Sequence, residues 1–489
     1  MMKKAFLTIL VYAASVSLSL AAPKDWDATY NHISKEYNLS SDGSQSCRTV
    51  EEMTYHSYHA IHDLYGETFI DYNPEWQDLV INSSYTKLVD GSIVMTPENA
   101  FVETLPKFAE NAPAHNSLIR LVVVHTGLEP GCSTYLDYTI ISKTGYLPEL
   151  DIITPVEYRS PINELTVSIT VPQEKKLRYS FSKTGPEPTV RTSTGKTTYL
   201  WSLKNLEAES SDPGDYKKAL FSASTFESKE SAFAFLSAQF TKVEEIDSTT
   251  MASIETKGSE SGKTVSVSRF LRERLSIVPI PLEIAGYRFR SIGDILNSAY
   301  ATTDEREMVR CALLNAAGVK AEVVPVYFCD PVGLASIRRL RTDAVSEIGI
   351  SSFEKKFSTK LKYGEADLKN GYLVIDLPFE NRAFNGKPYS TYPSTRSNDL
   401  NLRRSFNEVH EYEIILEDGL TPSGLENLQT NISNDAGYCN VTVGRTGNVI
   451  TVTRTIEIYK DTIAPAEYAA FRELIAAWIT AKRFIVRKP

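Results

Sequence analysis

The chain has 489 residues, of which 42% are hydrophobic and 23% charged, and its formal net charge is −9. This composition is ordinary for a folded soluble protein, and the length predicts about three domains. A nucleic-acid-binding protein normally carries a basic patch, so the acidic balance argues against a nucleic-acid partner.

Residues 1–22 have the pattern of a secretory signal peptide. Lys3 and Lys4 precede an apolar stretch that ends in small residues at Ala21 and Ala22, which suits a cleavage site. We therefore expect an exported protein, periplasmic or secreted, with an uncleaved anchor as the alternative. No later segment offers the ~18 consecutive apolar residues of a membrane-spanning helix, so no transmembrane segment is expected after cleavage.

The next two segments differ in their apolar content. Residues 23–53 are polar and are predicted to be a loosely packed lead-in, whereas residues 54–246 are predicted to be mostly strands. Apolar and polar residues alternate over 165–171, which indicates a half-buried strand. Residues 121–124 form a continuous apolar run that fits a central strand. Asp90-Gly91 between two short strand-like runs indicates a hairpin.

Several motifs within 54–246 occur in the order of a known domain. They are Tyr72-Asn73-Pro74-Glu75-Trp76-Gln77, Pro97-Glu98-Asn99-Ala100, His125-Thr126-Gly127-Leu128-Glu129-Pro130-Gly131 and Leu136-Asp137-Tyr138. This stretch resembles an uncharacterised domain that precedes transglutaminase-like domains in exported proteins of Gram-negative bacteria. The resemblance implies a β-sandwich and brings no known activity with it.

Residues 247–262 contain few bulky apolar side chains and are predicted to be a linker. A mixed α/β domain is predicted over 263–400, in which 265–275 fits either a helix or a strand. A firmer helix is expected at 304–317, because apolar residues recur on one face and Gly318 suits its C-terminal cap. Thr302 followed by Glu305 is a capping-box pattern for its start.

The run from Tyr287 to Gly318 is similar to the core of the transglutaminase-like (papain-like) cysteine hydrolases. In that superfamily the aromatic residue corresponding to Tyr300 leads into a helix whose first residues include the catalytic cysteine, and counting back from Gly318 places that position at Thr303 here. The resemblance places the catalytic histidine on the following strand, near Ser358, Thr359 or Lys360 within 356–363. It places the aspartate at Asp376, on a strand at 372–377 that is expected to form a hairpin with 356–363 around Asn370-Gly371.

Two of these three catalytic positions are therefore lost. No histidine lies between His125 and His410, and a threonine hydroxyl without an adjacent base is a poor nucleophile. We interpret Thr303 and Asp376 as vestigial positions and expect no catalytic residue. Two rearranged centres stay open: a Cys311–His410 dyad, which needs the C-terminal domain to fold over the cleft, and Thr303 with Lys360 as a base of lowered pKa.

Metal binding is weighed at one histidine run. His56, His59 and His62 could share a helix face, but we predict ordinary surface or packing residues, with no metal and no cofactor. The cysteines show no metal-site spacing, and their odd number leaves at least one thiol unpaired or in an intermolecular bond. They are Cys47, Cys132, Cys311, Cys329 and Cys439.

The last segment, 401–489, is predicted to be a β domain with one long helix. Tyr412, Ile414 and Leu416 alternate with polar residues as in a strand. A helix is expected to begin near Pro465, and its apolar stripe is expected to pack on the neighbouring sheet, with partner binding as the alternative. The stripe consists of Tyr468, Phe471, Leu474, Ile475, Trp478 and Ile479.

Together these features predict a multidomain α+β protein of the bacterial envelope. It would have an N-terminal β-sandwich, a degenerate transglutaminase-like α/β domain and a C-terminal β domain with a helix. The leading hypothesis is a non-catalytic protein that binds a peptide, a protein or a glycan in the vestigial cleft. The alternatives are a cysteine or threonine amide hydrolase, or transglutaminase-like peptidase, with a rearranged centre, and a structural envelope component that acts through its β domains.

Overall fold

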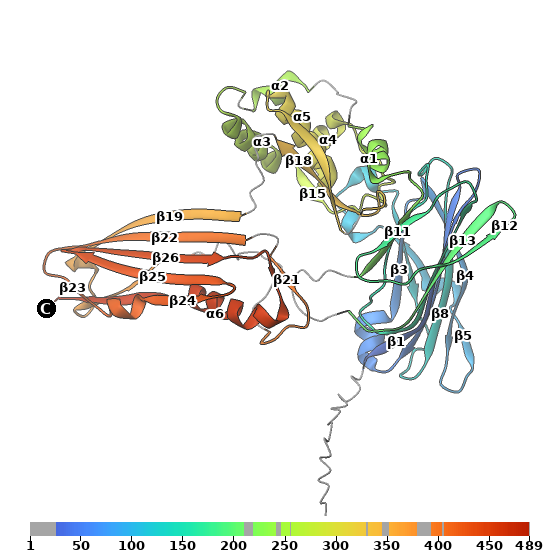
Figure 1. Cartoon of the computed structure of the whole chain (residues 1–489), viewed down its shortest axis with the longest axis horizontal. Helices are drawn as coiled ribbons and strands as arrows, with labels where there is room; N and C mark the ends of the chain where they lie inside the picture. Colours follow the sequence, from blue (N-terminus) through green and yellow to red (C-terminus); the bar gives the residue numbers. More distant parts are fainter. Residues whose placement is uncertain are drawn as a thin grey trace, which may run out of the picture.

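A computed structural model describes residues 26–209, 219–240, 246–254, 256–328, 331–344, 352–378, 393–402 and 405–488. These residues form three bodies, which Figure 1 shows as an N-terminal strand-rich body, a central body that contains most of the helices, and an elongated C-terminal body. The predicted signal peptide, 1–22, and Cys329 lie outside the described residues.

The N-terminal body has two layers. One layer is an eight-stranded sheet in the order β12-β13-β10-β1-β2-β8-β4-β5, and the other is split into the sheets β11-β14-β9 and β3-β7-β6. The bounds are β1 Ala28–Leu39, β2 Gln45–Tyr55, β3 Glu67–Tyr72, β4 Gln77–Lys87, β5 Ile93–Met95, β6 Phe101–Thr104, β7 Ile119–Val124, β8 Ser133–Ser142, β9 Asp151–Pro155, β10 Ile162–Pro172, β11 Arg178–Phe181, β12 Thr189–Ser193, β13 Lys196–Leu206 and β14 Leu220–Ser224. Short helical turns join them: η1 Ala60–Tyr65, η2 Glu98–Ala100, η3 Lys107–Ala109 and η4 Pro113–His115.

Side chains that alternate along β10 fill the space between these layers. Leu165, Val167 and Ile169 are almost fully buried and pack with Phe221 of β14 in one core. The predicted strand at 165–171 is thereby confirmed, and so is the hairpin at Asp90-Gly91, where β4 pairs with β5. The two-layered arrangement agrees with the expected sandwich.

The prediction of a lead-in at 23–53 is wrong. β1 and β2 lie inside the large sheet, where β1 pairs with β2 and β10, and β2 pairs with β8. The error has a physical reason. Most residues of these strands are polar, so the segment has a low overall apolar content, although single residues such as Ile33 and Met53 are buried.

In the described residues, the central body combines five helices, α1 to α5, with two short sheets. Its core joins α3 and α4 with α5, and α5 also packs on the ribbon formed by β17 and β18. The bounds are α1 Lys229–Ser237, α2 Ser248–Ala252, α3 Glu260–Arg274, β15 Ser276–Val278, α4 Ile292–Ser298, β16 Tyr300–Thr302, α5 Thr303–Ala316, β17 Ala321–Tyr327 and β18 Ile337–Ala344.

This body begins earlier and ends earlier than predicted. The predicted linker at 247–262 contains α2 and the start of α3, and α1 packs with Tyr287 and Leu334 of the central body. The prediction that the body continues to residue 400 is also wrong, because β19 and β20 belong to the C-terminal sheets. Since β19 pairs with β22 and β20 with β28, the expected hairpin between 356–363 and 372–377 does not form.

The C-terminal body packs α6 against the five-stranded sheet β19-β22-β26-β25-β24, beside the smaller sheets β20-β28-β23 and β21-β27. The predicted stripe is confirmed except at Ile479, which is 48% exposed: Phe471, Leu474 and Trp478 are fully buried against Cys439 and Ile456 of the sheet. The bounds are β19 Ser352–Tyr363, η5 Glu365–Asp367, β20 Tyr372–Asp376, β21 Leu400–Asn401, β22 Ser405–Leu416, β23 Thr421–Ser423, η6 Leu425–Leu428, β24 Thr430–Asn434, β25 Gly437–Thr446, β26 Val449–Ile458, β27 Thr462–Ile463, η7 Pro465–Glu467, α6 Tyr468–Ile479 and β28 Arg483–Arg487. Among the helices of the described ranges, none has the length and hydropathy needed to cross a membrane.

Candidate functional site

The N-terminal and central bodies are docked through a shared apolar core. Residues of the 105–118 segment pack with Val278, Ile280 and Tyr300 of the central body. Hydrogen bonds surround this core: the Asn73 side chain donates to the Ile284 carbonyl at 3.0 Å, and Ala114 N–H donates to the Tyr300 hydroxyl at 2.8 Å. The interface therefore combines apolar burial with directional contacts.

A buried carboxylate fixes a second contact between these bodies. Asp151 of β9 accepts the backbone N–H groups of Leu334 and Ala335 at 2.9 and 2.7 Å, and also accepts from the Ser224 hydroxyl. Burial raises the pKa of Asp151 to about 6, although these hydrogen bonds oppose that rise. A Cβ at Gly333 would lie 1.8 Å from the Asp151 carboxylate, so this turn requires glycine.

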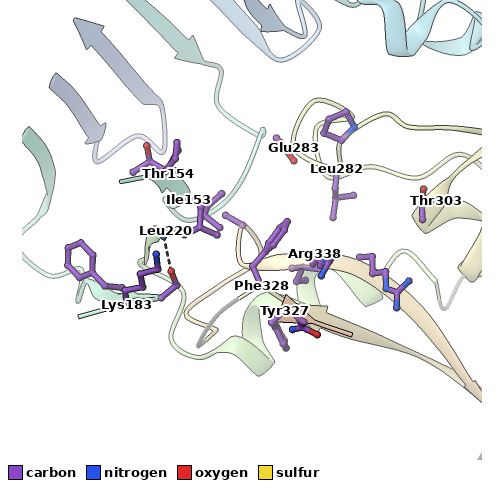
Figure 2. A pocket seen from close by; sticks show the side chains of 18 of the residues that line it. Ile153, Thr154, Lys183, Leu220, Leu282, Glu283, Thr303, Tyr327, Phe328 and Arg338 are labelled. Atoms are coloured by element: carbon purple, nitrogen blue, oxygen red, sulfur yellow. Dashed lines mark hydrogen bonds between the residues drawn. The ribbon is translucent and has the colours of Figure 1, made fainter. Parts of the chain in front are cut away.

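A cleft of about 1300 Å³ lies where the three bodies meet. Figure 2 shows Phe328 and Arg338 beside each other on the β17–β18 ribbon, with Leu282 and Glu283 across the cavity and Thr303 at the start of α5. The N-terminal wall includes Ile153 and the C-terminal wall runs over 397–401. Since no single body encloses this space, the cleft depends on how they are docked.

Thr303 is the first residue of α5, as the sequence predicts. Thr302 caps the helix, because its hydroxyl accepts the Glu305 N–H at 3.1 Å and Glu305 returns the bond to the Thr302 N–H. Within the described residues, the Thr303 hydroxyl makes no hydrogen bond, and no cysteine or histidine lines the cleft. Thr303 thus occupies the cleft without a group that could take its proton.

Three buried acids in the first turns of α5 hold backbone groups in place. Asp304 accepts the Leu340 N–H at 2.7 Å, and Glu307 accepts the Thr342 N–H at 3.1 Å. Leu340 and Thr342 lie on β18 opposite Pro325 and Val323 of β17. The carboxylates therefore cover the edge of β18 that faces α5, and the wall of the cleft is built on this contact.

Glu305, the middle acid of the three, is bound from the other side. Arg290 donates to its carboxylate from Nε and Nη2 at 2.9 and 2.7 Å, and the Arg290 guanidinium lies 4.1 Å above the Tyr300 ring. Sequence reasoning saw only a helix cap here. The clustered acids after Thr303 were a usable signal, because acids in a helix's first turn are favourable but rarely fully buried.

The pKa values of the neighbouring acids are shifted in opposite directions. Burial alone would raise the pKa of Glu305, but hydrogen bonds from Arg290 and Thr302 hold that pKa below its ordinary value. Burial raises the pKa of Asp304, and its single backbone hydrogen bond does not offset that effect. At the cleft mouth, loss of hydration raises the pKa of Glu283, with the nearby Asp304 charge adding to the rise.

The structure does not bring Asp376 to Thr303. Asp376 ends β20 in the C-terminal body and forms an exposed ion pair with Arg483 at 2.9 Å. Ser358, Thr359 and Lys360 lie on β19, where Lys360 pairs with Glu413 at 2.6 Å. The predicted positions for a histidine and an aspartate were therefore wrong, because both strands left the central body for the C-terminal sheets.

The two rearranged centres are not formed either. Cys311 lies on α5 and lines a separate apolar cavity of about 510 Å³, where burial raises the pKa of its thiol. His410 is buried in the C-terminal body, with Nε2 2.7 Å from the Glu408 carboxylate. Thr303 and Lys360 likewise lie in different bodies. A thiol of raised pKa is a weak nucleophile.

The histidine run is on the surface of the N-terminal body. His59 pairs with Asp63 at 2.9 Å, His56 contacts the Thr29 hydroxyl at 2.9 Å, and His62 stacks on Tyr58. In the described part of the chain, no group of three or more His, Cys, Asp or Glu side chains is placed to hold a metal ion. In the same part, the free cysteines are Cys47, Cys132, Cys311 and Cys439.

Comparison with known proteins gives a family. Domains of unknown function match at 41–210 (DUF3857) and at 371–484 (DUF3858). A crystal structure described as "a putative protease" from Parabacteroides distasonis matches with 32% identity and a TM-score of 0.83, covering 94% of this chain and 99% of the other. The chain belongs to this DUF3857–DUF3858 family. The DUF3858 match begins just before β20, in agreement with the placement of β20 in the C-terminal body.

Two further comparisons add nothing about function. An M1 zinc metallopeptidase from Deinococcus radiodurans overlaps 40% of this chain and 42% of its own, at 9% identity and a TM-score of 0.22, which is too low to carry an argument. No curated protein matches the chain.

Proposed function

We propose that this protein is an exported, transglutaminase-like component of the bacterial envelope that binds an extended peptide segment without cleaving it. One observation carries the proposal. Thr303 corresponds to the nucleophile position of the transglutaminase-like hydrolases and lines a cleft between the three bodies. No described residue that lines this cleft supplies a thiol or an imidazole. A cleft of this kind, with neither of these catalytic groups in its described lining, is suited to binding a ligand.

The lining favours a peptide over a glycan. The walls carry apolar and aromatic side chains such as Ile153, Leu282, Tyr327 and Ile337, and Phe328 is 49% exposed. Exposed aromatic and aliphatic groups gain free energy when they cover apolar side chains. A volume of about 1300 Å³ is larger than an ordinary small-molecule pocket, which spans roughly 300–1,000 Å³, and it suits a segment of several residues.

A peptidase is the second candidate. It is favoured by the relative described as a "putative protease", which shares 32% identity over almost the whole chain. Of the nucleophiles considered from the sequence, Thr303 lines the cleft, whereas the thiol of Cys311 lies in another cavity. Hydrolysis abolished by Thr303→Ala would therefore establish this candidate and end the binding proposal.

Fluorescein-labelled β-casein, a chain without stable structure, separates the two candidates. Binding of the full-length protein is expected to raise the fluorescence anisotropy of the labelled casein. Cleavage of the casein would separate its dyes and raise the fluorescence intensity, and we expect no such rise. Phe328→Ala is expected to weaken binding about tenfold, since it removes an aromatic contact of ~1.5 kcal/mol.

Phe69→Ala is the matched control for this test. Phe69 lies on β3 and is 53% exposed, outside the cleft lining. Equal binding by the wild type and Phe328→Ala, with Phe69→Ala also unchanged, would contradict binding in the cleft. Loss of binding in both variants would point to the N-terminal body instead.

Export forms part of the proposal and is supported by the pattern of 1–22. N-terminal sequencing of the protein from its native cell is expected to start after Ala21 or Ala22. A mature chain that keeps Lys3 and Lys4 would contradict export through cleavage.

A further inference from the structure

The basic side chains that line the cleft differ in whether they form ion pairs. Lys183 on the N-terminal wall is paired with Glu157 at 2.7 Å. Arg338 and Arg339, at the start of β18, are exposed and line the cleft. Across the described ranges, no carboxylate lies within ion-pair distance of either guanidinium. Among the described residues that line the cleft, these two arginines are therefore the basic side chains without an ion pair.

The nearby acids do not neutralise them. The Asp304 carboxylate is committed to the Leu340 N–H at 2.7 Å and is influenced by Arg339 only at longer range. Glu283 faces the cleft from the opposite wall and forms no ion pair with either arginine. Asp399 belongs to the C-terminal wall. The β18 wall consequently presents positive charge next to the exposed ring of Phe328.

From this arrangement we infer that the peptide carries a carboxylate, which Arg338 and Arg339 bind, while an apolar residue of the peptide covers Phe328. Guanidinium groups present several N–H donors in a plane and bind carboxylates through paired hydrogen bonds. The carboxylate has two possible sources, an Asp or Glu side chain and the C-terminus of the peptide. This inference rests on the proposed peptide-binding function and specifies its ligand.

An array of immobilised random twelve-residue peptides tests the inference with the full-length protein. Each sequence is displayed four ways: with its Glu and Asp residues kept or replaced by Gln and Asn, and with a free or amidated C-terminus. Replacing the carboxylate that is recognised is expected to reduce binding about tenfold, because hydrogen bonds to charged groups contribute roughly 1.5–3 kcal/mol. Loss on side-chain replacement identifies an acidic residue, and loss on amidation identifies the C-terminus.

Variants assign the effect to the two arginines. Arg338→Ala with Arg339→Ala is expected to remove the difference between acidic and neutral peptides and to leave residual binding through Phe328. Arg341→Ala is the matched control, because Arg341 lies on the same strand, pairs with Asp343 at 2.6 Å and is outside the cleft lining. That control is expected to keep the full preference for acidic peptides.

The outcomes separate this inference from the proposed function. Binding that depends on Phe328 but is indifferent to carboxylates and to both arginines would overturn the inference and leave peptide binding intact. Absence of binding to every peptide and to β-casein would overturn both. Cleavage of acidic peptides by the wild type, with the preference lost in the double arginine variant, would support the carboxylate site and overturn only the non-catalytic part.

Discussion

Two helices, α5 and α6, are attached to their sheets in different ways. α6 buries Phe471, Leu474 and Trp478 completely and sits on its sheet through apolar contact. α5 buries Met308, Val309 and Leu313 from its second turn onward, but its first turns also bury acids that bind backbone N–H groups and Arg290. Apolar contact fixes how closely a helix packs, whereas hydrogen bonds also fix its rotation and its register.

This difference coincides with the position of the cleft. The start of α5, with Thr303, forms part of the cleft wall, whereas α6 carries none of the lining residues. Carboxylates that hold Leu340 and Thr342 keep β18, and with it Arg338 and Arg339, at a set position relative to α5. The directional contacts of α5 therefore lie where this helix forms part of the cleft wall.

The largest effect is expected from Phe471→Ala in α6. Phe471 is fully buried, and removing a buried aromatic side chain costs about 3–5 kcal/mol through lost apolar burial and the cavity that remains. Hydrogen exchange of α6 and β25 amides, followed by mass spectrometry, measures this loss in the C-terminal body alone. The loss is expected to be the same at pH 4.5 and pH 7, since no titratable group is removed, and a strong pH dependence would contradict purely apolar attachment.

A smaller effect with a pH signature is expected from Glu305→Gln in α5. The change removes the negative charge from a buried pair with Arg290, which costs roughly 2–3 kcal/mol at pH 7. Because the pKa of Glu305 is lowered in the folded state, its contribution is fully present above the ordinary glutamate pKa of about 4.3 and is lost as pH falls through the lower folded value. Exchange of α5 amides is expected to differ from wild type at pH 7, and the difference is expected to shrink as pH falls below about 4.3.

Glu322→Gln is the matched control, since Glu322 is an exposed acid on β17 of the same body. The control is expected to change the exchange of α5 amides by less than about 0.5 kcal/mol. An equal loss in both variants would show that the net charge of the body, rather than the bond to Arg290, stabilises α5.

Much of the fold was open to prediction from the pattern of apolar residues. The alternation in β10, the stripe of α6 and the capping box of α5 depend on local spacing, and each formed where the sequence indicated. The errors concern which strands pair with each other. β19 and β20 were correctly expected as strands, but pairing with β22 and β28 depends on contacts far along the chain, which local spacing does not contain.

The candidate site was predictable only at its first residue. Thr303 lies at the helix start and in the cleft, as the motif indicates. Arg338, Arg339 and Phe328 had no local signature, because a cleft formed by three bodies brings together residues whose neighbours in the sequence are unremarkable. The acids of α5 can be read from the sequence, but their burial cannot. Their burial depends on β18 and Arg290, which only the tertiary structure places beside them.

The smallest effect, and the sharpest test, is expected from Asp304→Asn. Asparagine keeps an oxygen that can accept the Leu340 N–H, so the cost is expected to stay below about 1 kcal/mol. Burial raises the pKa of Asp304, so the folded state holds its proton at pH values where the unfolded chain has released it. The wild type therefore loses stability relative to Asp304→Asn as pH rises from about 3.9 through the raised folded value. This slope is opposite to that of Glu305→Gln, although the two residues are adjacent. Exchange of α5 amides between pH 3 and pH 7 compares the variants directly, and slopes of the same sign would show that the two carboxylates share one environment instead of binding separate partners.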